Sequence, residues 1–346
     1  MQNQPNRYDY HPSYTPYYQP TYYQTPQQEE SKRLRKDGTF IGIMLLAMTL
    51  AMNLMFSVIM FFMEFISSIS GETIPFAERM DNTTYLVMYA IVYAFDLILP
   101  SVLVAWCCKR RYFPLSPAKP VPPVDVFLGV LSGLGGCIAA NFIATYVSFY
   151  LQRFGLYPTV SSSMVEDTPT SLILNLLAVA VLPALLEEMV YRGYVLRTLR
   201  GYGDWFAVMV SALMFGLMHG NTTQIPFAFM VGIILGWLYV MTDNIWLPVT
   251  VHFCNNAMSV LLSYLHLDMP VADQNLFTLF VFMAVGVMGI LSFVVLCVRR
   301  GALMRRLPRR SLLSSGRRWG VLLTTPAFLI AVVLHIILTL VASVQQ

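Results

Sequence analysis

Long apolar runs, each about as long as a bilayer crossing, alternate along this chain with short polar connections. A hydrocarbon core of about 30 Å requires roughly 20 helical residues. The pattern therefore predicts an all-α, polytopic transmembrane bundle of about nine spans. These spans fall near residues 40–63, 85–108, 126–151, 171–191, 204–220, 225–242, 245–266, 276–298 and 320–344. The fourth to seventh are short and closely connected, which favours one compact core at about residues 126–266.

Composition supports a membrane protein. Of the 346 residues, 57% are hydrophobic and 12% are charged, and the mean hydropathy is +0.61. A soluble domain carries about 25% charged residues. The five cysteines have no spacing typical of a disulfide framework or a zinc ribbon.

The first residues have a different character. Residues 1–30 are rich in Tyr, Pro and Gln and contain no apolar run, so they are not a signal peptide. Such a composition cannot build a packed core. We expect residues 1–36 to form a disordered cytoplasmic tail and residues 37–344 to form the bundle.

Basic residues predict the orientation of the bundle. They gather before the first span and after the second, fourth and eighth spans, as Lys32, Arg33, Arg35, Lys36, Lys109, Arg110, Arg111, Lys119, Arg197, Arg200, Arg299, Arg300, Arg305, Arg306, Arg309, Arg310, Arg317 and Arg318. Nine crossings place all these clusters on one side. Cytoplasmic loops are enriched in Lys and Arg, so we expect a cytoplasmic N-terminus and a C-terminus on the opposite side.

The most informative polar residues are two adjacent glutamates in the fourth span. A carboxylate inside a membrane helix is costly and usually faces the protein interior, where it has a function. Glu188 and Arg192 are four residues apart in the favourable acid-first order, so an intrahelical ion pair is expected. Glu187 lies about 100° away around the helix and is therefore free to act as a general base on water.

Two histidines and an asparagine follow in the next apolar segments. On antiparallel helices Glu187 and His219 reach similar depths, about 20–25 Å from the turn near Tyr202, so they can face each other. His252 is predicted to lie nearer that end, with Asn256 one turn further on the same face. An amide donor beside an imidazole suits stabilisation of an oxyanion. Each residue alone is also explained by hydrogen bonding between helices, and the Glu pair with Arg192 by a buried ionic contact.

In these segments the chain resembles the CAAX-protease and bacteriocin-processing (CPBP, or Abi) membrane peptidases. Their pattern is EExxxR, FxxxH and HxxxN, in that order. This chain has Glu187, Glu188 and Arg192, then Phe215 and His219, then His252 and Asn256. Each motif alone is weak, but the ordered set is specific. The resemblance covers about residues 171–262.

The resemblance implies an α-helical bundle with a membrane-embedded catalytic cavity open to the cytosol. By position, Glu187 would activate water with help from His219. His252 and Asn256 would support the oxyanion, and Glu188 and Arg192 would shape the site. Members of the Ras-converting type cleave prenylated CAAX proteins, and other relatives are linked to bacteriocin maturation or immunity. We therefore expect a multi-pass protein of a bacterial plasma membrane.

Metal dependence is left open by the sequence. The family has been described both as metalloproteases and as glutamate proteases. No HExxH pattern of a helical zinc protease is present, which favours a mechanism without a cofactor. If zinc is bound, its candidate ligands are Glu187, Glu188, His219 and His252.

The sequence favours an intramembrane endopeptidase that acts near the cytoplasmic membrane interface. Its expected partners are a membrane-associated peptide or lipidated protein and the lipid bilayer, with no nucleic acid. One alternative is a non-catalytic bacteriocin immunity or scaffold protein of the same fold. A proton-coupled transporter is disfavoured, because no internal repeat or pair of broken helices is evident.

Overall fold

A computed structural model describes the chain in segments. They are residues 24–71, 74–110, 115, 118–157, 165–304 and 311–344. Most of the predicted tail, residues 1–23, lies outside the described residues. Residues 26–36 were expected in the tail but form the first turns of a helix. The sequence contains the reason: Thr25 and Gln28 form a reciprocal capping box, and Pro26 occupies the first turn.

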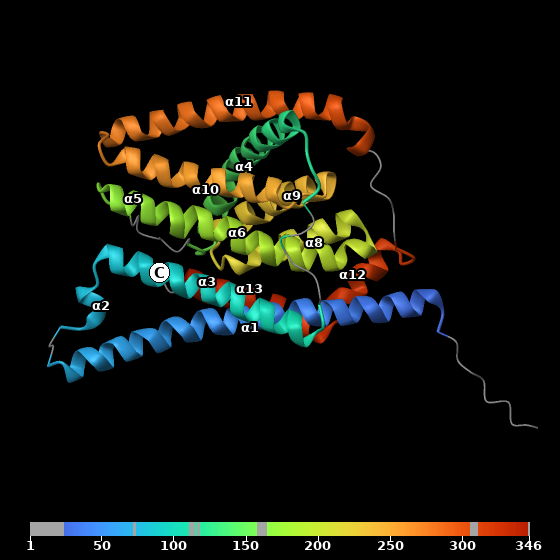
Figure 1. Ribbon diagram of the computed structural model, residues 1–346, viewed down its shortest axis with the longest axis horizontal. Helices are drawn as coiled ribbons and strands as arrows, with labels where there is room; N and C mark the ends of the chain where they lie inside the picture. The colour runs from blue at the N-terminus through green and yellow to red at the C-terminus, as the bar shows by residue number, and fades with distance from the viewer. Residues whose placement is uncertain are drawn as a thin grey trace, which may run out of the picture.

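The described residues form a helical bundle (Figure 1). Its helices are α1 (Pro26–Ile69), α2 (Phe76–Arg79), α3 (Asn82–Cys107), α4 (Pro123–Gln152), α5 (Pro169–Asn175), α6 (Leu182–Glu188), α7 (Arg197–Leu199), α8 (Asp204–Met218), α9 (Gln224–Thr242), α10 (Trp246–His266), α11 (Val271–Met304), α12 (Ser315–Leu323) and α13 (Pro326–Val344). Two π-helical segments, η1 (Leu176–Val181) and η2 (Met189–Leu196), and a 3₁₀ turn, η3 (Arg200–Tyr202), join α5, α6 and α7 into one long rod. The polytopic helical fold predicted from the sequence is confirmed.

Seven helices of the described chain are long and apolar enough to cross a membrane, so the chain is an integral multi-pass membrane protein. Nine spans were expected. Helix α8 has 15 residues, about 22 Å at 1.5 Å per residue, which is shorter than a hydrocarbon core. Helix α10 carries His252, Asn255 and Asn256 and is not among the seven. The count of nine stays a prediction.

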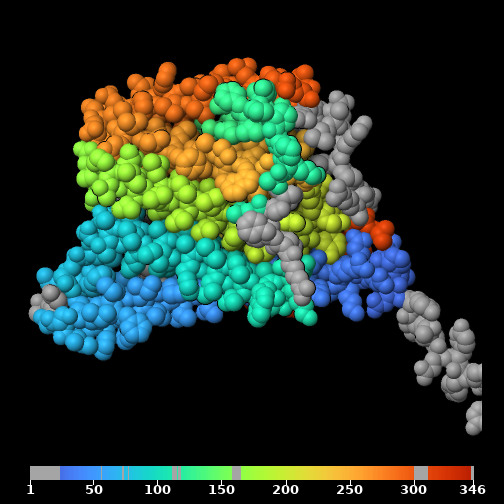
Figure 2. All heavy atoms as spheres, in the orientation of Figure 1, coloured from blue at the N-terminus to red at the C-terminus, as the bar shows by residue number. Residues whose placement is uncertain are grey.

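Most long helices run along one common direction, and α4 crosses them at a steep angle (Figure 1). In the space-filling view α11 lies along one edge and α1 along the opposite edge (Figure 2). The bundle has two distinct ends. The basic end is the end at which α3, α9 and α11 finish and α4 and α8 begin, so the residues near these termini include Arg110, Lys119, Arg200, Asp243 and Arg299. The remote end is the end at which α1 and α10 finish, at Ile69 and His266, and α3 and α5 begin, at Asn82 and Pro169. Helix α1 begins at the basic end and ends, at Ile69, at the remote end (Figure 1).

Glycines allow several helices to pack closely. A Cβ placed on Gly289 of α11 would lie 2.5 Å from the Cα of Gly135 of α4. A Cβ on Gly232 of α9 would lie 2.8 Å from the Cα of Ala212 of α8. Small residues at such crossings let membrane helices gain packing that lipid tails cannot replace.

Substitution of Gly289 by alanine is expected to destabilise the bundle by about 1–3 kcal/mol, because the new methyl group overpacks the α4–α11 crossing. The matched control is Gly286→Ala on the same helix, where an added Cβ meets nothing within 4 Å. That control should leave the midpoint of thermal unfolding in detergent unchanged or slightly higher, since alanine is the better helix former. An equal loss of stability in the two variants would contradict the close contact between α4 and α11.

Candidate functional site

A fully buried ion pair lies at the centre of the bundle. Nη1 of Arg192 is 2.7 Å from Oε1 of Glu188, and neither side chain is exposed. The guanidinium also donates through Nη2 to the carbonyl of Gly232, 3.2 Å away, and lies over the ring of Phe215 at 4.7 Å. The ion pair expected from the i, i+4 spacing is confirmed.

His252 of α10 lies between the two glutamates. Its Nδ1 is 3.0 Å from Oε1 of Glu188, and its Nε2 is 3.6 Å from Oε2 of Glu187. Because a carboxylate oxygen only accepts, Nδ1 carries the hydrogen. The sequence placed His252 nearer the basic end than Glu187, but the structure brings the two side chains together.

Glu187 faces a cavity of about 300 Å³ in the middle of the bundle. Its Oε1 accepts a hydrogen bond from the hydroxyl of Tyr93 on α3. Its buried Oε2 has no hydrogen-bond partner among the described residues. One carboxylate oxygen is therefore held in place by Tyr93, while the other is buried without a hydrogen bond.

His219, at the end of α8, lines the same cavity but is not hydrogen-bonded to Glu187. Its Nδ1 is 2.8 Å from the carbonyl oxygen of Phe215. A carbonyl only accepts, so Nδ1 is the donor, and Nε2 of the neutral ring keeps its lone pair. His219 can therefore act on a molecule in the cavity.

Asn256 also lines the cavity, where its side chain satisfies a main-chain carbonyl. Its Nδ2 donates to the carbonyl of Val179, 3.0 Å away, and its Oδ1 accepts from Asn255. Val179 lies four residues before Pro183, which has no N–H to return to that carbonyl. One N–H of the Asn256 amide thus forms a hydrogen bond between α10 and η1, and the other remains for a ligand.

The long rod that carries both glutamates is not a regular α-helix. The π-helical segment η1 ends before Pro183, and η2 begins at Met189, directly after the glutamates. π-Helical turns inside α-helices are frequent at functional sites. Each π-helical turn changes which face of the helix points inward. The two glutamates lie between two such turns, which together set their direction.

Sequence reasoning missed three features of the cavity. Tyr93 was not considered, although Tyr85, Tyr89 and Tyr93 fall four residues apart and stack along one face of α3. The π-helical segments have no recognisable residue pattern. Asp96 was not among the candidate residues, but it is buried, it lines the cavity, and its Oδ1 has no partner among the described residues.

The residues proposed as zinc ligands do not form a ligand set. Within the described segments, no group of three or more His, Cys, Asp or Glu side chains has a geometry that could hold a metal ion. Oε1 of Glu188 is already bound to Arg192 and His252, and Nδ1 of His252 is bound to Glu188. This arrangement does not fit the four-residue zinc site considered above.

The fold and site define a class: a polytopic membrane protein with a glutamate–histidine–arginine cluster beside an internal cavity. Residues 169–258 match the family model described as type II CAAX prenyl endopeptidase Rce1-like. This segment lies inside the expected core and contains the six motif residues. The resemblance to the CPBP family is thereby confirmed over this part of the chain.

Two curated proteins are similar to the chain. A Bacillus subtilis protein named "Putative membrane peptidase YdiL" is 23% identical over 142 residues, which cover 40% of this chain and 58% of that protein. An Escherichia coli protein named "Uncharacterized 24.3 kDa protein" is 22% identical over 169 residues, or 47% of this chain and 76% of that protein. No solved structure matches the chain significantly.

Removal of Arg192 is expected to destabilise the protein by about 3–5 kcal/mol, because Arg192→Met leaves the buried carboxylate of Glu188 without its ion-pair partner. The double variant Glu188→Gln, Arg192→Met should be closer to wild type than Arg192→Met alone, since no unpaired charge remains. Thermal unfolding in detergent measures both.

The matched control is the exposed pair Glu29–Arg33, which has the same i, i+4 spacing and a separation of 3.6 Å. Arg33→Ala should change stability by less than about 0.5 kcal/mol. A double variant as unstable as Arg192→Met would show that the ion pair is not the source of the loss.

Proposed function

We propose that this protein is an intramembrane endopeptidase that hydrolyses a peptide bond of a membrane-associated peptide or lipidated protein, as CAAX prenyl endopeptidases do. The observation that carries the proposal is the position of Glu187. Glu187 lines the cavity, and its unpartnered Oε2 lies 3.6 Å from Nε2 of His252. A carboxylate beside an imidazole in a site of low polarity suits general-base activation of water.

In the proposed reaction, Glu187 accepts a proton from a water molecule as the water attacks the scissile carbonyl. The resulting oxyanion is stabilised by the remaining N–H of Asn256 and by His252. Collapse of the tetrahedral intermediate breaks the C–N bond, and the proton on Glu187 passes to the leaving amine. His219, with a free Nε2 on the same cavity, orients the water.

Charge balance supports a role for His252 beside Glu187. Glu188 is neutralised by Arg192, whereas the basic side chain beside Glu187 is His252, 3.6 Å away. A net negative charge at mid-membrane is costly. We propose that Nε2 of His252 also carries a hydrogen, so that the ring offsets this charge and can donate to the oxyanion.

Tyr93 is proposed as a positioning residue. Its hydroxyl holds Oε1 of Glu187, so Oε2 stays directed toward His252. The reaction is also proposed to lie deeper than the cytoplasmic interface suggested by the sequence. Glu187 is fifteen residues before Tyr202, which corresponds to about 22 Å along a helix.

The location is proposed as a bacterial plasma membrane, with the basic end in the cytoplasm. The gathering of Lys and Arg at this end supports the orientation, and both similar proteins come from bacteria. The second candidate, a non-catalytic scaffold or immunity protein, is less well supported because all six motif residues line or brace one cavity.

Cleavage of a quenched fluorescent farnesylated CAAX peptide by the detergent-purified protein tests the proposal. Glu187→Gln should reduce turnover by about 10²- to 10⁴-fold, the usual contribution of a general base. Tyr93→Phe should reduce turnover by about 10- to 100-fold, the equivalent of a hydrogen bond to a charged group. The matched control Tyr85→Phe, on the same face of α3 but outside the cavity lining, should be unaffected.

The assay is repeated with a zinc chelator. Turnover that survives the chelator is expected for a glutamate-type enzyme. Turnover that stops and returns with added Zn²⁺ would contradict the proposed chemistry. Full activity of Glu187→Gln would refute the assignment of the base.

A further inference from the structure

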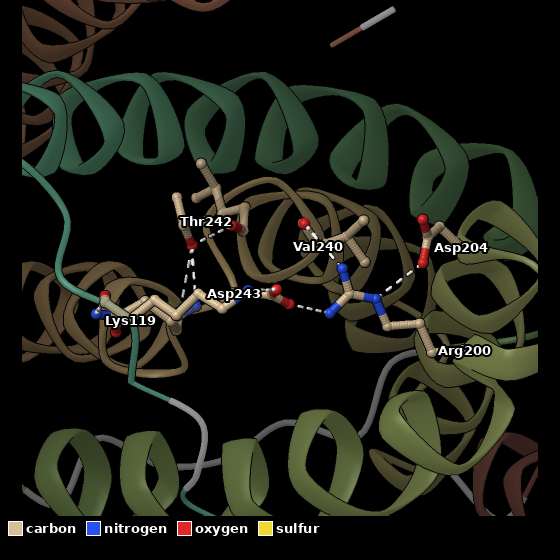
Figure 3. A network of polar contacts seen from close by, with 8 residues as sticks. Lys119, Arg200, Asp204, Val240, Thr242 and Asp243 are labelled. Carbon is tan, nitrogen blue, oxygen red and sulfur yellow. Dashed lines mark hydrogen bonds and ion pairs between the residues drawn. The ribbon is translucent and has the colours of Figure 1, made fainter. Parts of the chain in front are cut away.

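The basic end of the bundle is closed by a network of ion pairs (Figure 3). Arg200 donates to Asp204, 2.8 Å away, and is also paired with Asp243, which in turn accepts from Lys119 at 2.5 Å. Burial raises the pKa of the Asp243 carboxyl, but the hydrogen bonds from Lys119 and Arg200 outweigh it and keep the pKa below its ordinary value. The network joins the rod that carries the glutamates, α8, the end of α9 and the segment before α4.

A second set of contacts at the same end secures α1. Asp37 of α1 accepts a hydrogen bond from the hydroxyl of Tyr202 at 2.6 Å and is ion-paired with Arg110. Arg318 of α12 donates to the carbonyl of Tyr202. Together the two sets bind the helices tightly at the basic end.

Between this end and the cavity the bundle is filled with apolar side chains. Members of this layer come from α1, η2, α7, α8 and α9 and are nearly or completely buried: Leu34, Ile41, Met44, Leu45, Val195, Leu196, Leu199, Val208, Leu235 and Tyr239. A close-packed protein interior leaves no route for a peptide. Access from the basic end is therefore blocked by the packing of the described residues.

The cavity extends from Glu187 in the other direction. Along the rod its lining runs from Val179 to Tyr191 and includes no residue from 192 to 202. Along α9 it runs from Gln224 to Val231 and includes no residue from 232 to 242. Gln224 is exposed and lies about 27 Å from Thr242 along the helix, so the lining becomes polar and accessible toward the remote end.

The packing of α1 also changes at the depth of the cavity. Before the cavity its inward side chains are buried, as with Ile41 and Met44 at 0% exposure. Beyond Met52, which lines the cavity, Phe61 is 67% exposed and Ile69 is 72% exposed. The remote half of α1, with α2, thus lies at the edge of the molecule with few close neighbours (Figures 1 and 2).

We propose that the cavity takes its substrate from the remote, extracytoplasmic half of the membrane, past the loosely packed half of α1. This differs from the cytosolic opening that the family resemblance implies. The substrate class follows if the proposed function is correct: a peptide that has been exported, or that is held in the outer leaflet by a lipid or an apolar segment. A reaction that translocates or inserts the peptide must precede cleavage.

Cysteine labelling in spheroplasts tests the side of access without requiring turnover. Four native cysteines (Cys107, Cys137, Cys254 and Cys297) are replaced by alanine, and exposed Cys108 is kept as the reporter of the basic end. In a background without Cys108, Ser70→Cys reports the exposed remote end, and Gln224→Cys and Asn255→Cys report the cavity. A small cationic methanethiosulfonate that cannot cross membranes is added before or after lysis, and the remaining thiols are counted by a mass-tagging maleimide.

The proposal predicts that both cavity cysteines react in intact spheroplasts as fully as Ser70→Cys, whereas Cys108 reacts at least tenfold less until lysis. Cavity cysteines that react only after lysis, together with Cys108, would overturn the proposal, as would cavity cysteines that never react. Reaction of Cys108 rather than Ser70→Cys in intact spheroplasts would show that the remote end is cytoplasmic and would also overturn it. Failure of the peptidase assay with the expected labelling would refute the function but leave the side of access established.

Discussion

A guanidinium in the middle of a membrane bundle needs a buried negative charge beside it. The arrangement of the whole site depends on the residue that supplies this charge. Arg192 is completely buried, and its charge is matched by Glu188 one turn earlier on the same helix. The pair is fixed against Gly232 and Phe215 and against His252. Separating the helices would leave buried charges without these contacts, which is strongly destabilising, so the helices have little freedom to move apart.

The same constraint separates the roles of two adjacent and chemically identical residues. Glu188 uses Oε1 for Arg192 and His252, so it is structural. Glu187 points toward the cavity, with Tyr93 on one oxygen and His252 near the other. The irregular turns on either side of the glutamates assist this separation. At Pro183 the missing N–H leaves a carbonyl to which Asn256 donates, so a backbone defect in one helix positions a side chain of another.

Much of this arrangement could be predicted from the sequence, because it depends on local rules. Apolar runs predicted the helices, and the i, i+4 spacing predicted the pair between Glu188 and Arg192. Three motifs in order indicated a common site. The contact of His252 with both glutamates depends on helix tilt, which spacing along one helix does not determine. Tyr93 comes from a helix without a motif, and the π-helical turns depend on packing rather than on residue type.

The most direct test of the central claim is an experimental structure of the Glu187→Gln variant with an uncleaved farnesylated CAAX peptide. Our account predicts that the scissile carbonyl carbon lies in the cavity, within about 3–3.5 Å of a water molecule held by residue 187, the distance at which attack becomes productive. The carbonyl oxygen should point toward His252 and Asn256. A peptide bound with its scissile bond outside the cavity, or beside residues other than these, would contradict the account.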